Sequence, residues 1–124
     1  MSCTLASVSL VRSFLFALEG ISYLIRTQRN ARIELAVGLV VLIVAVWVRV
    51  TPVEWALLAL TIAIVLALEA LNTALELIVT LASPERHPLA KAAKDVSAAM
   101  VLIAAIGAVL VGIAIFRPYL DLVY

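Results

Sequence analysis

The segment VEWALLALTIAIVLALEALNTALELIVTL, residues 53–81, decides the fold. Its first half, from Trp55 to Leu68, carries no charged side chain, whereas its second half carries polar residues at intervals of three and four. This pattern is typical of a helix that crosses a lipid bilayer and keeps a functional face near one end. We therefore predict a transmembrane helix at residues 53–82, with Pro52 in the first turn, a position that suits proline.

Two other segments have the same apolar character. The stretch from Leu35 to Val48 carries no charge, and residues 96–116 form a second uncharged run. A bilayer core requires about 20 apolar residues of a helix, so both runs are long enough to cross it when their flanks are included. We predict two more transmembrane helices at residues 33–50 and 96–116, the last one ended by Arg117 and Pro118.

The overall composition excludes a water-soluble domain. The chain has 124 residues, of which 66% are hydrophobic and only 14% charged, with a mean hydropathy of +1.23. Soluble domains are about a quarter charged, and a domain this small has too much surface to hide such an excess of apolar residues. The net charge of +1 gives no reason to expect a nucleic-acid partner. A single cysteine, Cys3, cannot form an intrachain disulfide.

The N-terminal segment, residues 5–25, mixes apolar and charged side chains. Leu10, Phe14 and Leu18 recur at helical spacing, and charged residues lie on another face. This pattern favours an amphipathic helix lying in the membrane interface, with a mobile tail as the alternative. The segment lacks the basic start and unbroken apolar run of a secretory signal, so we expect no cleavage. The predicted fold is all-α, a single membrane domain over residues 1–124 with one interfacial helix and three transmembrane helices.

The distribution of basic residues predicts the orientation. Seven basic residues precede the first span or lie between the second and third: Arg12, Arg26, Arg29, Arg32, Arg86, Lys91 and Lys94. Two, Arg49 and Arg117, lie on the opposite side of the membrane. Because cytoplasmic loops are enriched in lysine and arginine, we expect a multi-pass protein of the cytoplasmic (inner) membrane. Its N-terminus would face the cytoplasm and its C-terminus the outside.

A row of polar residues marks the candidate site. Glu69, Asn72, Glu76 and Thr80 are spaced three, four and four apart, so they share one helix face, with Thr73 beside them. A charged side chain within hydrocarbon costs roughly 3 kcal/mol or more, so two carboxylates on one face need a proton, a cation or a basic partner. The alternative is that they only join helices through hydrogen bonds.

Further polar groups are expected at the same membrane face. The loop after the second predicted span carries Glu85, His87, Lys94 and Asp95, and the approach to the first span carries Arg26, Gln28, Arg29, Asn30, Arg32 and Glu34. Such a convergence suits a polyanion and a divalent cation meeting a lipid headgroup. A solvated loop histidine and topology-setting arginines are the simpler interpretations. The sequence contains no standard phosphate-binding loop, so the phosphates of a bound nucleotide would have to be held without one.

Two motifs carry a resemblance to a known family. Residues 69–76, EALNTALE, are similar to the signature E-x-x-N-[ST]-A-x-E of the prokaryotic diacylglycerol kinase family, and residues 87–96, HPLAKAAKDV, to its second signature, H-x-L-x-x-x-A-K-D. Residues 26–34 resemble its approach to the first span. The resemblance covers residues 9–116 and implies a homotrimeric membrane kinase that uses ATP and Mg²⁺ to phosphorylate a lipid hydroxyl.

The resemblance also implies roles for particular residues. Glu69 would be the general base, assisted by Asn72, and would contact the lipid headgroup together with Arg32 and Glu34. Glu76 would hold Mg²⁺, with Gln28 as a second ligand. The remaining matches, implied to contact the nucleotide together with Glu76, are Glu85, Arg86, His87, Lys94 and Asp95.

Two positions depart from the family pattern. Gln28 stands where many members have a metal-binding glutamate, and Thr80 stands where aspartate is usual. A catalytically impaired member is therefore one alternative, and a small transport or structural subunit is another. The loop and the approach to the first span look closer to the branch that includes undecaprenol kinases, so undecaprenol is favoured over diacylglycerol. One chain cannot surround the polar row, and the third span is rich in alanine and glycine, so self-association is expected independently.

Overall fold

Four helices make up the computed structural model, which describes the backbone of residues 3–123 and the side chains of residues 9–122. They are α1 (Cys3–Thr27), α2 (Arg29–Val48), α3 (Pro52–Ala82) and α4 (Pro88–Val123), and the described residues contain no strand. The all-α prediction is confirmed. Three of the helices, α2 to α4, are long and apolar enough to cross a membrane, so the chain is a multi-pass membrane protein. The side chain of Cys3 lies outside the described residues.

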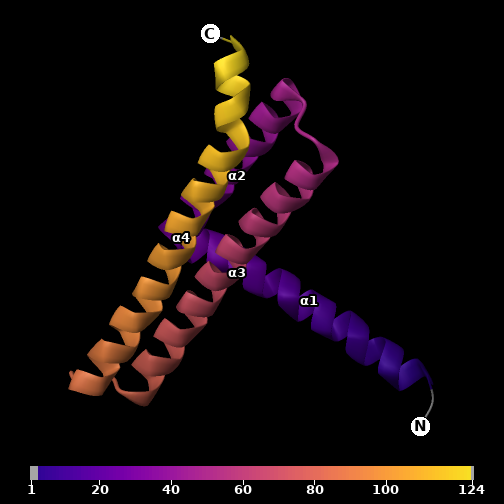
Figure 1. The fold of residues 1–124 in the computed structure, drawn as a ribbon. Helices are drawn as coiled ribbons and strands as arrows, with labels where there is room; N and C mark the ends of the chain where they lie inside the picture. Colours follow the sequence, from indigo (N-terminus) through magenta and orange to yellow (C-terminus); the bar gives the residue numbers. More distant parts are fainter. Residues whose placement is uncertain (1–2, 124) are drawn as a thin grey trace.

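Helix α1 stands apart from the other three. Figure 1 shows it running obliquely away from the bundle, in which α2, α3 and α4 lie roughly along one direction. Apolar side chains such as Phe14, which is 66% exposed, are largely uncovered by the described residues. The predicted N-terminal helix is therefore present, and its exposed apolar surface suits a place in the membrane interface.

The joint between α1 and α2 is a single non-helical residue. Gln28 has extended backbone angles, φ −110° and ψ 110°, which end the first helix and redirect the chain. The Nη1 atom of Arg32 donates hydrogen bonds to the carbonyl oxygens of Ile25 and Arg26, both at 3.0 Å. Arginine thus satisfies carbonyls that the end of α1 leaves without a helical partner.

A tight turn connects α2 to α3. Arg49 ends α2 in the left-handed conformation, at φ 60°. Thr51 then caps α3: its hydroxyl accepts from the backbone N–H of Glu54, and the Glu54 carboxylate accepts from the Thr51 N–H. Pro52 occupies the first turn, as predicted, because proline there lacks only an N–H that would have no helical acceptor.

Helices α3 and α4 form a long antiparallel hairpin and pack closely along their length (Figure 1). Helix α4 begins at Pro88 and continues to Val123, so it extends beyond the apolar run at residues 96–116. Arg117 and Pro118 end the uncharged run, but the helix itself continues through both residues. A proline within a helix removes one backbone hydrogen bond and bends the axis, and Figure 1 shows the last turns of α4 leaning away from the preceding ones.

The buried apolar core is small and lies at the end of the bundle that holds the α2–α3 turn. It consists of Ala45, Val50, Leu58 and Ile115. Most other large apolar side chains are exposed, as expected of a surface that faces lipid rather than water. The buried polar residues lie farther along α3, toward the α3–α4 loop, which separates the stabilising core from the candidate site.

Candidate active site

A buried polar segment of α3 forms the centre of the site. Glu69 is 1% exposed and is the largest fully buried side chain among the described residues. Its Oε2 atom has no hydrogen-bond partner there, and Asn72 and Thr73 are buried beside it. Thr73 donates to the backbone carbonyl of Glu69 at 3.0 Å and therefore leaves the carboxylate free. Burial decreases toward the loop, since Glu76 is half-buried and Thr80 exposed.

A chain of hydrogen bonds links α4 to this row. The Ser97 hydroxyl, on α4, donates to Oδ1 of Asn72 at 2.7 Å, and Nδ2 of Asn72 lies 3.5 Å from Oε1 of Glu76. Ser97 is 4% exposed, so this polar contact is made inside the helix hairpin. The chain joins Ser97 to Asn72 and Glu76, two residues of the motif at residues 69–76.

Helix α2 contributes a third carboxylate. Glu34 is partly buried, its Oε2 atom has no hydrogen-bond partner among the described residues, and it lies close enough to Glu69 for the two charges to repel each other. Glu69 in turn is repelled by Glu76. Buried acceptors without partners are rare in folded proteins, and they point to a proton or a bound ligand that completes the site.

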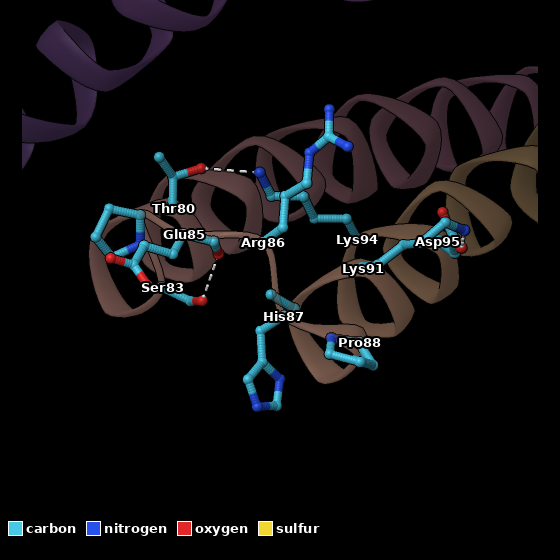
Figure 2. A pocket seen from close by; sticks show the side chains of 11 residues that line it. Thr80, Ser83, Glu85, Arg86, His87, Pro88, Lys91, Lys94 and Asp95 are labelled. Atoms are coloured by element: carbon cyan, nitrogen blue, oxygen red, sulfur yellow. Dashed lines mark hydrogen bonds and ion pairs between the residues drawn. The ribbon is translucent and has the colours of Figure 1, made fainter.

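The loop between α3 and α4 forms an open cavity of about 840 Å³ (Figure 2). The Lys94 ammonium donates to the Thr80 hydroxyl at 3.0 Å across the base of the hairpin, as Figure 2 shows. A second cavity shares Thr80 and Lys94 with the first and is also lined by Glu76, so the polar row opens onto the loop. The residues lining the first cavity are Thr80, Ser83, Pro84, Glu85, Arg86, His87, Pro88, Ala90, Lys91, Lys94 and Asp95.

Local hydrogen bonds shape this loop. Nδ1 of His87 accepts from the backbone N–H of Leu89 at 3.1 Å and so satisfies a free donor in the first turn of α4. The Ser83 hydroxyl donates to the carbonyl of Glu85 at 2.9 Å. Lys91 and Asp95 form an exposed ion pair one helical turn apart, at 2.6 Å. In Figure 2 the Arg86 guanidinium extends from the loop on the side opposite the His87 ring.

Most of the residues singled out in the sequence lie along one continuous path. It runs from the partly buried Glu34 and the buried Glu69, through Asn72 and Glu76, to Lys94, which lines both cavities. The loop cavity also holds Glu85, Arg86, His87 and Asp95. Their catalytic, nucleotide-binding and metal-binding roles stay predictions.

Two of the predicted residues are engaged elsewhere. The side chain of Gln28 lies within 3.5 Å of the Thr27 hydroxyl, and among the described residues no hydrogen bond joins it to Glu76. Arg32 binds carbonyls at the end of α1. Sequence reasoning also missed Ser97, which is the polar residue in an otherwise apolar part of α4 and faces the polar row.

The residues fit a magnesium ion only with help from a substrate. In the described part of the chain, no group of three histidine, cysteine or acidic side chains could hold a metal ion. Mg²⁺ usually keeps several waters and takes one or two carboxylates together with substrate phosphates. A half-buried Glu76, with one oxygen near Asn72 and an open cavity beside it, meets that requirement.

Comparison with known proteins identifies the family. The family model for prokaryotic diacylglycerol kinase matches residues 15–116. The chain is 45% identical over 111 residues to a diacylglycerol kinase of Synechocystis sp., covering 89% of this chain and 63% of that protein. It is 40% identical over 109 residues to the undecaprenol kinase of Bacillus subtilis, covering 88% and 89% of the two chains.

A third relative is more distant. The diacylglycerol kinase of Haemophilus influenzae is 30% identical over 95 residues, which cover 77% of this chain and 80% of the relative. The family match includes α2, α3 and most of α4, and therefore every residue of the path described above. This chain belongs to the prokaryotic diacylglycerol kinase family, a family of membrane lipid kinases.

Proposed function

We propose that this protein transfers the γ-phosphate of ATP to the hydroxyl group of undecaprenol at the cytoplasmic face of the inner membrane. The observation that carries the proposal is Glu69, a carboxylate with an unpartnered buried oxygen on a lipid-embedded helix. Such a group costs stability unless something binds there. Its position on a row that leads to a basic, open cavity suits a reaction between a lipid and a water-soluble anion.

Glu69 acts as the general base in this proposal. Its free oxygen accepts the proton of the lipid hydroxyl while that hydroxyl oxygen attacks the γ-phosphorus; the bond from the γ-phosphorus to its bridging oxygen breaks, and ADP leaves. Asn72 lies one turn along the same face, and its amide group contacts the Glu76 carboxylate. Glu34 approaches from α2 and helps to confine the headgroup.

The loop cavity holds the nucleotide in this proposal. The Lys94 ammonium stands at the boundary of the two cavities, where it neutralises phosphate charge. Arg86 and Lys91 add positive charge to the walls, and Glu85 and Asp95 supply acceptors for the hydroxyl and amino groups of the nucleotide. His87 acts locally, because its Nδ1 atom already caps α4.

Glu76 is the metal ligand in this proposal. Its carboxylate would hold Mg²⁺ on the phosphate side of the row, and the ion when bound supplies charge neutralisation at the phosphate oxygens. The contact from Asn72 to Oε1 leaves the second oxygen of Glu76 without a hydrogen bond among the described residues. Gln28 and Arg32 are secondary, because the single chain places them at the α1–α2 joint.

Undecaprenol is proposed as the acceptor because the α3–α4 loop and the approach to α2 resemble the branch that includes undecaprenol kinases, and because a relative of similar length is an undecaprenol kinase, although identity to the diacylglycerol kinase of Synechocystis sp. is higher. The match to undecaprenol kinase of Bacillus subtilis extends over 89% of that protein, whereas the match to diacylglycerol kinase of Synechocystis sp. extends over 63% of its length. The diacylglycerol kinase of Haemophilus influenzae is less similar, at 30% identity. A homotrimer, with the N-terminus and the α3–α4 loop in the cytoplasm, would cover the exposed flanks of the site.

A direct assay tests the proposal. Purified protein in detergent receives ATP and Mg²⁺ with either undecaprenol or diacylglycerol, and phosphorylated lipid is measured. We expect turnover with undecaprenol and a loss of at least about 100-fold in Glu69→Gln, because general-base catalysis contributes roughly 10²–10⁴-fold. Glu19→Gln, which neutralises an exposed glutamate on α1, is the matched control and keeps its activity.

Other outcomes point to the alternatives. Turnover that survives Glu69→Gln unchanged removes the general-base role. Cation flux across liposomes without ATP consumption would instead support a transport subunit, and a folded trimer without turnover would support an impaired member of the family. Faster phosphorylation of diacylglycerol than of undecaprenol would keep the kinase and change its substrate.

A further inference from the structure

Ser97 is a buried polar residue that the roles proposed above do not use. It lies on α4 at the start of an otherwise apolar run and is 4% exposed. Its hydroxyl donates to Oδ1 of Asn72, on α3, at 2.7 Å. A short, buried hydrogen bond between side chains of two lipid-embedded helices fixes both partners, because water does not compete for either.

The contacts with Ser97 and Glu76 together set which way the Asn72 amide faces. With Oδ1 bound by Ser97, the Nδ2 group is directed toward Oε1 of Glu76, 3.5 Å away. The reverse orientation would place the amide oxygen against a carboxylate oxygen, and both atoms are acceptors. The contact to Glu76 is long and therefore weak, so the shorter bond from Ser97 is the one that holds the amide group in place.

We propose that Ser97 is a positioning residue: by holding Oδ1 of Asn72, it aims the amide N–H at Glu76 and thereby orients the carboxylate that would hold the metal ion. The inference rests on the proposed function for the role of Glu76. One oxygen of Glu76 is steadied by Asn72, and the other is left for the cation. Without the Ser97 hydroxyl, the buried amide oxygen has no donor and the side chain turns to find one.

The chain offers a clean spectroscopic test, because it contains two asparagines, Asn30 and Asn72. Labelling asparagine with ¹⁵N in the side chain gives two pairs of NH₂ signals, and the exposed Asn30 serves as an internal reference. In Ser97→Ala we expect the Asn72 pair to shift and to exchange faster with water, while the Asn30 pair stays in place. Ser97→Thr keeps a hydroxyl and restores the original signals.

Kinetics then separate positioning from packing. In Ser97→Ala we expect the Mg²⁺ concentration for half-maximal lipid phosphorylation to rise about tenfold, with a smaller change in the KM for the lipid, and Ser97→Thr to recover most of it. Thr61→Val is the matched control: it removes a hydroxyl that bonds only to the backbone of its own helix, at Leu57 O, and leaves the Mg²⁺ requirement unchanged.

The outcomes distinguish this inference from the proposed function. Asn72 signals that do not move in Ser97→Ala, or an unchanged Mg²⁺ requirement in that variant, overturn the positioning role even when the enzyme is active. If the unmodified protein phosphorylates no lipid, the proposed function fails. The contact of Ser97 and Glu76 through Asn72 is then tested by NMR alone. Glu76→Gln must shift the Asn72 signals, and the shift must be smaller when Ser97 has been replaced by alanine. Equal shifts in both backgrounds refute the inference.

Discussion

Replacing Glu69 with leucine should make the protein more stable while abolishing its activity. The side chain is 1% exposed, and its Oε2 atom has no hydrogen-bond partner in the described chain. A buried polar group without a partner costs about 1–3 kcal/mol, and an acidic side chain near the middle of a span costs roughly 3 kcal/mol. Leucine has a similar size and no polar atoms, so we expect the free energy of unfolding to rise by about 1–3 kcal/mol.

The measurement is unfolding in detergent micelles, followed by the fluorescence of Trp47 and Trp55, without ATP or Mg²⁺. Glu69→Gln keeps a polar side chain of the same shape and should gain less than Glu69→Leu, which separates the cost of the charge from that of the buried polar atom. Glu19→Leu is the control: this glutamate is exposed on α1, and its replacement should change stability by no more than about 0.5 kcal/mol.

A destabilisation of 1 kcal/mol or more in Glu69→Leu would refute the reasoning. That result would mean that the carboxylate joins α3 to its neighbours, as a purely structural polar residue does. A variant that was more stable but still phosphorylated lipid would show that the buried carboxylate destabilises the fold without being needed for catalysis. Only higher stability together with lost turnover fits a carboxylate that is retained for catalysis at the expense of the fold.

Three further predictions concern the loop and the joint. Lys94→Met should raise the KM for ATP about tenfold or more. Lys91→Met should raise it less, because Lys91 is paired with Asp95 at 2.6 Å. The two variants are compared by measuring lipid phosphorylation at increasing ATP concentrations. Thr80→Asp should change turnover less than about tenfold, because the threonine hydroxyl already accepts a hydrogen bond from Lys94 and an exposed ion pair would add only about 0–1 kcal/mol. If activity appeared only in the aspartate variant, the natural chain would be an impaired member of the family. Arg32→Ala removes two hydrogen bonds that close the α1–α2 joint, so limited proteolysis should cut near residue 28 faster, and an unchanged cleavage rate would contradict that role.

Much of the fold follows from the sequence, because lipid leaves few alternatives. Apolar runs of about 20 residues must be helical in a bilayer. Pro52 was expected in the first turn of α3 and lies there, whereas the cap that Thr51 and Glu54 form was not predicted. The polar row at Glu69 and Glu76 was also predictable, since helical periodicity alone puts these residues on one face.

The errors and omissions have physical causes as well. A proline near the end of a helix costs one hydrogen bond, which a long helix can tolerate, so α4 continues through Pro118. Ser97 escaped notice because one serine in an apolar run looks like a small packing residue; its role depends on the rotation of α4 relative to α3, which no local pattern specifies. Arg32 could be read as a topology signal or a ligand, and only the bend at Gln28 brings the carbonyls of α1 within its reach.

The geometry of α3 limits how the proposed reaction can be arranged. Helices rise about 1.5 Å per residue, so Glu69 lies about 16 Å along the axis from Thr80, and Glu76 lies about 10 Å from Glu69 on the same path. Lys94 is bonded to Thr80 and therefore belongs to the far end of this path. It is too distant along the axis to serve the same phosphate that Glu69 prepares a hydroxyl to attack. In the proposed reaction the phosphate chain would therefore run inward from Lys94 past Glu76, so that the γ-phosphate would be the deepest group and would meet the lipid hydroxyl beside Glu69. The gradient from an exposed Thr80 to a fully buried Glu69 suits this direction, because charge is neutralised stepwise before the reacting phosphate reaches the part of the site that excludes water.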